Sequence, residues 1–159
     1  MLQTDFSTTY HQYAPMLYKI AFVYLGNAHD AEEMVQEAFV RLYTSAPNFQ
    51  SEEHRKAWMI RVISNLCKNQ LSSVWHKRVT PTPELLDYHA PEEGDRELLA
   101  LVVALPVKYK MPLYLYYYEN YSVQEIADTL RLGLSAVKMR LKRGRELLKD
   151  ALEEREALE

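Results

Sequence analysis

The chain has 159 residues, of which 48% are hydrophobic and 26% are charged, a composition typical of folded globular proteins rather than disordered ones. No apolar run reaches the roughly 18 residues that a membrane-spanning helix needs, so we expect no membrane insertion. The N-terminus lacks the basic and then apolar pattern of a signal peptide. The single cysteine, Cys67, can form neither an internal disulfide nor a metal cluster. These features favour a protein of the reducing cytoplasm.

The net charge of −3 is unevenly distributed along the chain. Residues 1–78 carry 8 Lys and Arg against 7 Asp and Glu, and residues 106–159 carry 10 against 9, so each segment has a net charge of +1. Residues 79–105 carry 1 against 6, a net charge of −5. A nearly neutral segment can still present a locally basic face, and such a face is what attracts an anionic partner.

The acidic middle of the chain, "VTPTPELLDYHAPEEGDRE", contains three prolines and a glycine and has no sustained helical periodicity. It predicts a linker over residues 75–95, between one domain at residues 1–74 and another at residues 96–159. Neither flanking segment shows strand-like alternation. The sequence therefore predicts an all-α fold of two small helical domains.

The first domain is expected to contain three helices. One covers Phe6–Leu25 and is ended by Gly26, and the third begins near Ser51. The helix between them has apolar residues at i, i+3, i+4, i+7, i+8 and i+11, which places them on one face. Asn27 is the expected N-cap of this helix. The six apolar residues are Ala31, Met34, Val35, Ala38, Phe39 and Leu42.

In the second domain, the stretch "LLALVVAL" predicts a first helix. Pro106 suits the first turn of the next helix, and Pro112 should bend that helix or shift its start. The stretch "SVQE", which starts at Ser122, is a capping box that opens a third helix. Ser135 is the expected cap of the last helix.

That last helix, "SAVKMRLKRGRELLK", contains six cationic residues and one acidic residue. Its apolar positions are followed one residue later, about 100° around the helix, by cationic ones, so a basic stripe lies beside a buried stripe. A surface helix of like charges repels itself, and a polyanion relieves that repulsion. The alternative is a solvated face without a partner. The apolar positions are Val137, Leu141 and Leu148, and the cationic ones are Lys138, Lys142, Arg145 and Lys149.

The preceding stretch, "IADTLRLGLSAV", has the spacing of a helix-turn-helix, with the small Ala127 allowing two helices to cross closely. This motif presents its second helix to the major groove of DNA. An ordinary helical hairpin is the alternative interpretation.

The stretch "LPVKYKMPLYLYYYENYSVQEIADTLRLGLSAVKMRLKRGRELLK" resembles the fourth conserved region of bacterial sigma factors. The stretches "DAEEMVQEAFVRLY" and "AWMIRVISNL" resemble their second conserved region. Both occur in the expected order across a short linker, so the chain is similar to the compact extracytoplasmic-function sigma factors nearly end to end.

This resemblance implies that one helix of the first domain binds core RNA polymerase by gripping a coiled coil of the beta-prime subunit. The matching residues lie mostly on the polar side of that helix, and exposed Val40 on the same side favours a contact over a merely solvated face. They are Asp30, Glu33, Gln36, Glu37 and Arg41.

By the same resemblance, the following loop and third helix melt and recognise the minus-10 promoter element. An unpaired base requires a pocket, a stacking surface and phosphate contacts. Arg55, Lys56 and Arg61 are the stronger candidates for DNA contacts, whereas Trp58 is better explained as a core residue. The full set is Asn48, Phe49, His54, Arg55, Lys56, Trp58, Arg61 and Asn65.

The last helix, again by resemblance, recognises the minus-35 element in the major groove. Arg and Lys side chains pair well with guanine edges, while phosphate contacts position the helix. Arg140 and Arg145 are expected to touch phosphates or to brace the fold. The full set is Ser135, Lys138, Met139, Arg140, Lys142, Arg143 and Arg145.

Three features depart from the family pattern. Arg131 stands in the turn where the family often has glycine, which predicts a reshaped turn. Met139 replaces a usual small serine, which puts the base recognised there in question. Asn69 and Ser72 replace a more basic ending of the third helix, which predicts weaker upstream promoter contacts.

The leading hypothesis is a promoter-specificity subunit with no catalytic activity, no cofactor and no metal. Its expected partners are the beta-prime and beta subunits of core RNA polymerase, promoter DNA and an anti-sigma factor. The runner-up is a stand-alone helix-turn-helix regulator that binds DNA without polymerase, often as a dimer. A third class, an enzyme acting on nucleic acid, is not supported by any cluster of carboxylates or metal ligands in the sequence.

Overall fold

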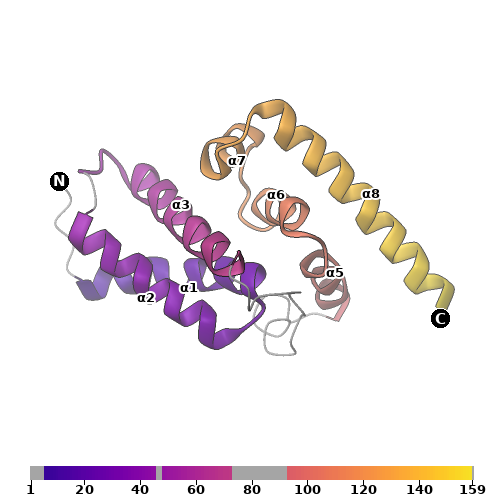
Figure 1. Cartoon of the computed structure of the whole chain (residues 1–159), viewed down its shortest axis with the longest axis horizontal. Coiled ribbons are helices and arrows are strands. Elements are labelled where there is room, and N and C mark those ends of the chain that lie inside the picture. Colours follow the sequence, from indigo (N-terminus) through magenta and orange to yellow (C-terminus); the bar gives the residue numbers. More distant parts are fainter. Residues whose placement is uncertain (1–5, 46–47, 73–92, 159) are drawn as a thin grey trace. The chain divides into compact units, whose positions relative to one another are not determined.

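The computed structural model describes residues 6–45, 48–72 and 93–158 of the chain, and of residues 93–96 only the backbone. Within these ranges the chain forms helices and no strand, so the all-α prediction is confirmed (Figure 1). The chain divides into two compact units, Met1–Arg78 and Val79–Glu159. Most of the predicted linker lies outside the described residues. The first described helix after it, α5, begins at Glu93, three residues before the predicted second domain.

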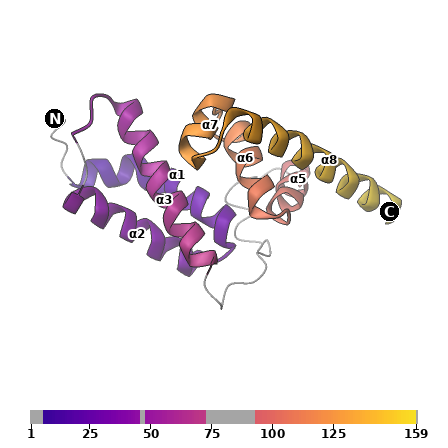
Figure 2. The same cartoon turned by 45° about the horizontal axis from the view of Figure 1, so that its top comes forward.

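Unit 1 is a bundle of three helices, α1 (Phe6–Leu25), α2 (Ala28–Ser45) and α3 (Glu52–Leu71), each packed against the other two (Figures 1 and 2). Apolar side chains from all three helices fill the centre of the bundle and anchor α2 and α3 on α1. The fully buried ones include Leu17, Ile20, Ala31, Ala38, Met59, Ile60 and Ile63.

Short-range signals set the helix ends in unit 1 as predicted. Gly26 ends α1 in the left-handed region with φ of 66°, where a side chain would be strained. Asn27 caps α2 by accepting the backbone N–H of Asp30 at 3.0 Å. Ser51 caps α3 by accepting the backbone N–H of His54 at 3.0 Å.

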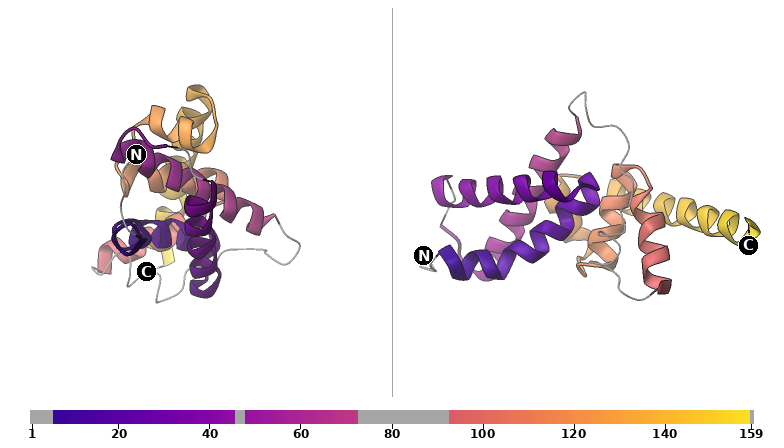
Figure 3. Two further views of the ribbon diagram at one scale, coloured as in Figure 1. Left: turned by 90° about the vertical axis from the view of Figure 1, so that its left-hand side faces the viewer. Right: turned by 90° about the horizontal axis from the view of Figure 1, so that it is seen from below.

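Unit 2 contains α5 (Glu93–Val103), α6 (Val107–Tyr117), α7 (Val123–Leu130) and α8 (Leu134–Leu158), and α8 packs against the other three (Figures 1 and 3). Pro106 occupies the N-cap of α6, and α6 keeps that start although Pro112 lies inside it. The capping box of α7 is confirmed, because the Ser122 and Glu125 side chains each accept the other residue's backbone N–H, at 3.0 and 2.9 Å.

The prediction that Ser135 caps the last helix is wrong. α8 begins at Leu134, and the backbone N–H of Val137 donates to the carbonyl of Gly133 at 3.1 Å. Gly133 therefore holds the N-cap position, which glycine fills almost as well as serine. Ser135 lies one residue inside α8 and is exposed.

In the turn between α7 and α8, position 131 adopts a left-handed conformation although its residue is arginine and not glycine. Arg131 has φ of 58° and ψ of 50°, and its N–H and that of Leu132 both donate to the carbonyl of Ala127. Most non-glycine residues are strained in this conformation. The backbone at Arg131 thus takes the conformation that a glycine would have taken.

We expect Arg131→Gly to stabilise unit 2 by about 1 kcal/mol, because glycine adopts positive φ without steric cost. Urea unfolding of the full chain, followed by circular dichroism, measures this gain. Asn120, with φ of 57°, is the matched control, since asparagine tolerates this region and Asn120→Gly should gain less. An equal effect of both substitutions would contradict the strain assigned to Arg131.

Unit 2 also buries a lysine. The Lys110 side chain is 1% exposed, and its Nζ donates to the carbonyl of Val103 at 3.4 Å. Burial disfavours the ammonium form and lowers the pKa of Lys110 from 10.5 to about 7. The unfolded chain therefore binds a proton between pH 7 and 10.5 that the folded chain does not, so stability rises with pH across this window.

Replacing Lys110 with Met should remove this pH dependence. We expect the free energy of unfolding of the wild type to rise between pH 7 and 8.5, by roughly 2 kcal/mol at most, and that of Lys110→Met to stay nearly flat over this range. Denaturant titrations of the full chain at several pH values provide the measurement. Lys108→Met, which removes an exposed lysine from the same helix, serves as control and should keep the wild-type slope.

Candidate nucleic-acid and protein interfaces

Only a narrow stripe of α8 is buried against the rest of unit 2. Val137, Leu141 and Gly144 are the buried residues of α8. Gly144 permits an especially close approach, because a Cβ atom there would lie 2.9 Å from Cδ1 of Leu113 on α6. On α7 the buried residues include Ile126 and Ala127, and α7 packs against α8. This packing determines which side of α8 remains open to a partner.

The open side of α8 carries most of the residues predicted to recognise the minus-35 element. The exposed fraction of Met139 is 71%, and Arg140 is half-buried. Arg143 forms an ion pair with Glu146 at 3.3 Å on the surface of the same helix. The exposed members of the set are Ser135, Lys138, Met139, Lys142, Arg143 and Arg145.

Arg145 has partners within the fold. Its Nε donates to the hydroxyl of Tyr117 at 2.8 Å, and its guanidinium lies 5.7 Å from the ring centre of Tyr116 and 5.8 Å from that of Tyr117. A cation over aromatic rings is attracted by their negative faces. Of the two roles that the sequence left open for Arg145, bracing the fold is therefore the one seen here.

An apolar groove of about 410 Å³ opens beside Arg145 in unit 2. Leucines from α5, α6 and α8 form much of its lining, and the cationic side chains of Arg145 and Lys149 lie at it. The groove was not predicted from the sequence. The signal that could have indicated it is the apolar stripe of α8, which continues to Leu148, a lining residue. The other lining residues are Leu98, Val102, Leu113, Tyr117, Tyr118 and Leu152.

In unit 1, α2 exposes a face with a polar and an apolar part. The five residues predicted to bind core polymerase lie here. Asp30 is half-buried and the other four are exposed, with Glu37 and Arg41 paired at 3.6 Å and Glu33 paired with His29 at 3.0 Å. Val40 is 53% exposed on this face, as expected.

The apolar part of this face is a groove of about 440 Å³, which sequence analysis did not predict. Its aromatic side chains come from two helices, so periodicity within either one could not reveal it. Phe6 and Tyr43 are 56% and 47% exposed, which is unusual for aromatic residues. The lining residues are Phe6, Tyr10, Gln36, Phe39, Val40, Tyr43 and Thr44.

The loop before α3 is held by what we call the Phe49 cluster, which consists of Phe49, His54, Arg55 and Trp58. The ring of Phe49 meets those of His54 and Trp58 edge to face, with centroids 5.3 and 5.6 Å apart. The Arg55 guanidinium lies 5.7 Å from the ring centre of Phe49. Nδ1 of His54 accepts the backbone N–H of Gln50 at 3.2 Å. The cluster holds residues 48–51, the described part of this loop, against the start of α3.

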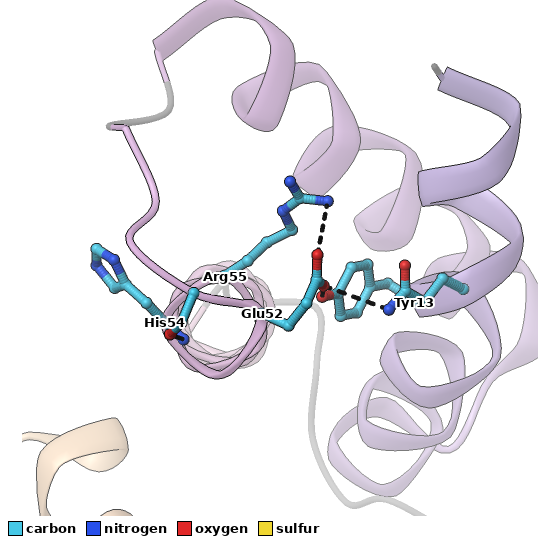
Figure 4. A network of polar contacts seen from close by, with 6 residues as sticks. Tyr13, Glu52, His54 and Arg55 are labelled. Carbon is cyan, nitrogen blue, oxygen red and sulfur yellow. Dashed lines mark hydrogen bonds and ion pairs between the residues drawn. The ribbon is translucent and has the colours of Figure 1, made fainter. Parts of the chain in front are cut away.

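The structure separates the residues predicted for the minus-10 element by their exposure. Asn48 and His54 are exposed, whereas Arg55 is only 4% exposed. Nη1 of Arg55 lies 3.7 Å from Oε1 of Glu52, and the other carboxylate oxygen, Oε2, accepts a hydrogen bond from Tyr13 of α1 (Figure 4). Arg55 was a strong candidate for a DNA contact on charge alone, but its side chain points inward. The remaining members, Phe49, Lys56, Trp58, Arg61 and Asn65, are half-buried.

None of the described helices has the length and apolar character required to cross a membrane. Nor do these residues bring three or more His, Cys, Asp or Glu side chains together in a way that could hold a metal ion.

Two family models match the chain, sigma-70 region 2 at residues 9–77 and sigma-70 region 4 at residues 95–148. The extracytoplasmic-function (ECF) RNA polymerase sigma factor SigE of Mycolicibacterium smegmatis is 31% identical, over 89% of this chain and 59% of SigE. The chain thus spans well under two thirds of that relative's length. The ECF sigma factor SigW of Bacillus subtilis is 28% identical, over 94% of this chain and 90% of SigW.

The fold is similar to that of the sigma factor RpoE, solved in complex with the anti-sigma factor NepR from Bartonella quintana. The TM-score is 0.72 at 16% identity, over 94% of this chain and 97% of RpoE. CnrH, solved in complex with the cytosolic domain of CnrY, gives a TM-score of 0.68 at 19% identity, over 93% and 87% of the two chains. The two sigma-70 regions, matched in their family order over most of the chain, show that the chain belongs to the sigma-70 family, and its relatives SigE and SigW are members of the extracytoplasmic-function group of that family.

Proposed function

We propose that the chain directs core RNA polymerase to promoters by recognising the minus-35 element with unit 2 and the minus-10 element with unit 1. The observation that carries this proposal is the exposed cationic side of α8 on a helix-turn-helix. The chain is an initiation factor and not an enzyme, as its family membership implies. Because core polymerase works in the cytoplasm, we place the protein there.

Unit 2 supplies the sequence-specific contacts to the minus-35 element. A helix-turn-helix inserts the N-terminal part of its second helix into the major groove. The first exposed cations along α8 lie in that part and are Lys138, Lys142 and Arg143. Met139 offers an apolar surface suited to a thymine methyl group rather than a hydrogen bond to a base. Arg140 is placed to touch phosphates.

Unit 1 supplies the main contact to core polymerase through the exposed face of α2. Its acidic side chains suit a basic coiled coil of the beta-prime subunit, and Val40 with the adjacent groove adds apolar area. In unit 2, the apolar groove beside Arg145 suits a helix of the beta subunit. The polar residues involved on α2 are Asp30, Glu33, Gln36, Glu37 and Arg41.

The loop before α3 and the N-terminal half of α3 recognise the melted minus-10 element. Asn48 and His54 are exposed there, and Phe49 and Trp58 offer partly exposed rings on which unpaired bases can stack. Lys56, Arg61 and Asn65 complete this surface. Because its side chain is only 4% exposed and lies against Phe49, we assign Arg55 a supporting role rather than a direct contact.

We also propose that an anti-sigma factor controls the protein by covering these surfaces. RpoE and CnrH, which share the fold, were both solved with a second protein, and the first of these is named as an anti-sigma factor. A partner that covered both the α2 face and the groove of unit 2 would block polymerase binding twice. Capture of the inhibitor with the full chain from its native cells tests this proposal.

In vitro transcription with purified core enzyme and a genomic promoter library tests the main proposal. Promoter-dependent initiation is expected only when the chain is present. A stand-alone helix-turn-helix regulator would bind duplex DNA without core enzyme and would not purify with beta-prime. If the chain supported no promoter-dependent initiation and did not associate with core enzyme, the proposal would be overturned in favour of that alternative.

Replacing Lys138, Lys142 and Arg143 together with Gln should abolish selection among minus-35 sequences. Each side chain that contacts a phosphate should also lower the slope of log K against log salt by about 1. Binding of the holoenzyme to duplexes over a range of salt concentrations measures both effects. Lys149→Gln removes a cation two turns further along α8, at the groove, and should leave minus-35 selection intact.

The substitution Val40→Arg should weaken association with core polymerase by at least about tenfold, since an unpaired charge would be desolvated in the interface. Fluorescence anisotropy of the labelled chain with core enzyme gives the dissociation constants. Leu158→Arg is the matched control, because it replaces another exposed aliphatic side chain, 89% exposed in the last turn of α8. Equal binding by both variants would remove the α2 face from the polymerase interface.

A further inference from the structure

Three side chains from two helices meet on the carboxylate of Glu52, the first residue of α3 (Figure 4). The Tyr13 hydroxyl donates to Oε2 at 2.5 Å, and Nε2 of Gln12 donates to the same oxygen at 3.3 Å. The other oxygen, Oε1, lies 3.7 Å from Nη1 of Arg55. Glu52 therefore ties the start of α3 to α1 while it pairs with the arginine one turn along α3.

This carboxylate acts on a buried positive charge. Arg55 is 4% exposed, whereas Glu52 is 50% exposed, and a guanidinium taken out of water requires a nearby counter-charge. The Tyr13 hydroxyl is held in its protonated form, since burial and then the hydrogen bond to Glu52 raise the pKa of Tyr13 well above its usual value. The Tyr13 hydroxyl therefore remains a donor to Glu52 at physiological pH.

The buried guanidinium links Glu52 to the loop. Arg55 lies against the Phe49 ring, which also meets His54 and Trp58 edge to face. A change in the Arg55 rotamer would remove one wall of the Phe49 cluster. The loop conformation thus depends on a carboxylate that does not touch the loop.

Glu52 is poorly suited to contact DNA itself, because a carboxylate repels phosphates. Its side chain is half exposed at the first residue of α3 and is not itself part of the buried core. If Glu52 only stabilised the bundle, its partner Arg55 would not need to lie against Phe49 as well. The position of Glu52 between α1 and the loop favours a role in holding that loop.

We propose that Glu52 is a positioning residue for recognition of unpaired promoter bases, acting through Arg55 on Phe49 with Tyr13 of α1 as its fixed support. This inference rests on the proposed function, because the bases are those of the melted minus-10 element. Arg55, which its charge would assign to DNA, is by this account part of the support beneath the loop.

Trp58 provides a probe of the loop in the free protein. The chain has two tryptophans, so Trp75→Phe leaves Trp58 as the only one. In that background we compare Glu52→Gln and Tyr13→Phe with Glu53→Gln, which removes an exposed carboxylate from the same helical turn. We expect acrylamide quenching of Trp58 to rise about twofold in the first two variants and to stay unchanged in the control, because the Phe49 cluster loosens only when Glu52 loses its contacts.

The same variants are then combined with core enzyme. We expect Glu52→Gln and Tyr13→Phe to slow promoter opening on the order of tenfold, while the affinity for a duplex carrying only the minus-35 element stays at the wild-type value. This second readout would not change if Glu52 merely stabilised unit 1. Tyr13→Phe removes a single hydroxyl group and carries the test if Glu52→Gln does not fold.

If Glu52→Gln matched Glu53→Gln in both measurements, the inference would be overturned. Slower opening without increased quenching of Trp58 would also overturn it, since the carboxylate would then act by another route. The proposed function is tested separately by the wild type. If the wild-type chain with core enzyme opened no promoter, that function would fail, whatever Trp58 reported in the free protein.

Discussion

The contact between Gly144 of α8 and Leu113 of α6 sets the orientation on which the DNA-binding surface depends. On α8 the apolar stripe lies about 100° around the helix from the cationic stripe. The cationic side chains face solvent only while the apolar side packs against the rest of unit 2. The absence of a side chain at Gly144 lets α8 approach α6 closely, with Val137 and Leu141 buried along the same line. Rotation of α8 about its axis would bury cations and expose leucines, so this packing fixes the side that meets DNA.

The cationic stripe of α8 serves two purposes along its length. Lys138 and Lys142 lie exposed in its first half, where a partner in the major groove would meet them. Arg145 and Lys149 lie at the apolar groove, and Arg145 is already bound to Tyr117. One sequence periodicity therefore spans the surface proposed for DNA and the groove proposed for polymerase. If both proposals hold, a single helix connects promoter contact to polymerase contact within unit 2.

Sequence predicted what local chemistry determines and missed what tertiary packing determines. The caps at Asn27, Ser51 and Ser122 were predictable because each depends on residues within one turn. The cap of α8 was predicted wrongly, because glycine and serine have similar preferences for the N-cap position and the structure places Gly133 there. Both grooves join residues from separate helices, and the buried Lys110 resembles a surface lysine in the sequence. The residue-level roles in DNA and polymerase binding remain predictions.

Arg55 and Arg145 show why charge alone overstates a nucleic-acid surface. Both were candidates for DNA contacts because they are cationic and lie in the expected segments. Arg55 instead pairs with Glu52 beneath Phe49, and Arg145 binds tyrosines beside a groove. Only a cation that can reach a phosphate displaces the counterions condensed on DNA. The cationic surface that each unit can offer to a nucleic acid is therefore smaller than its count of Lys and Arg suggests.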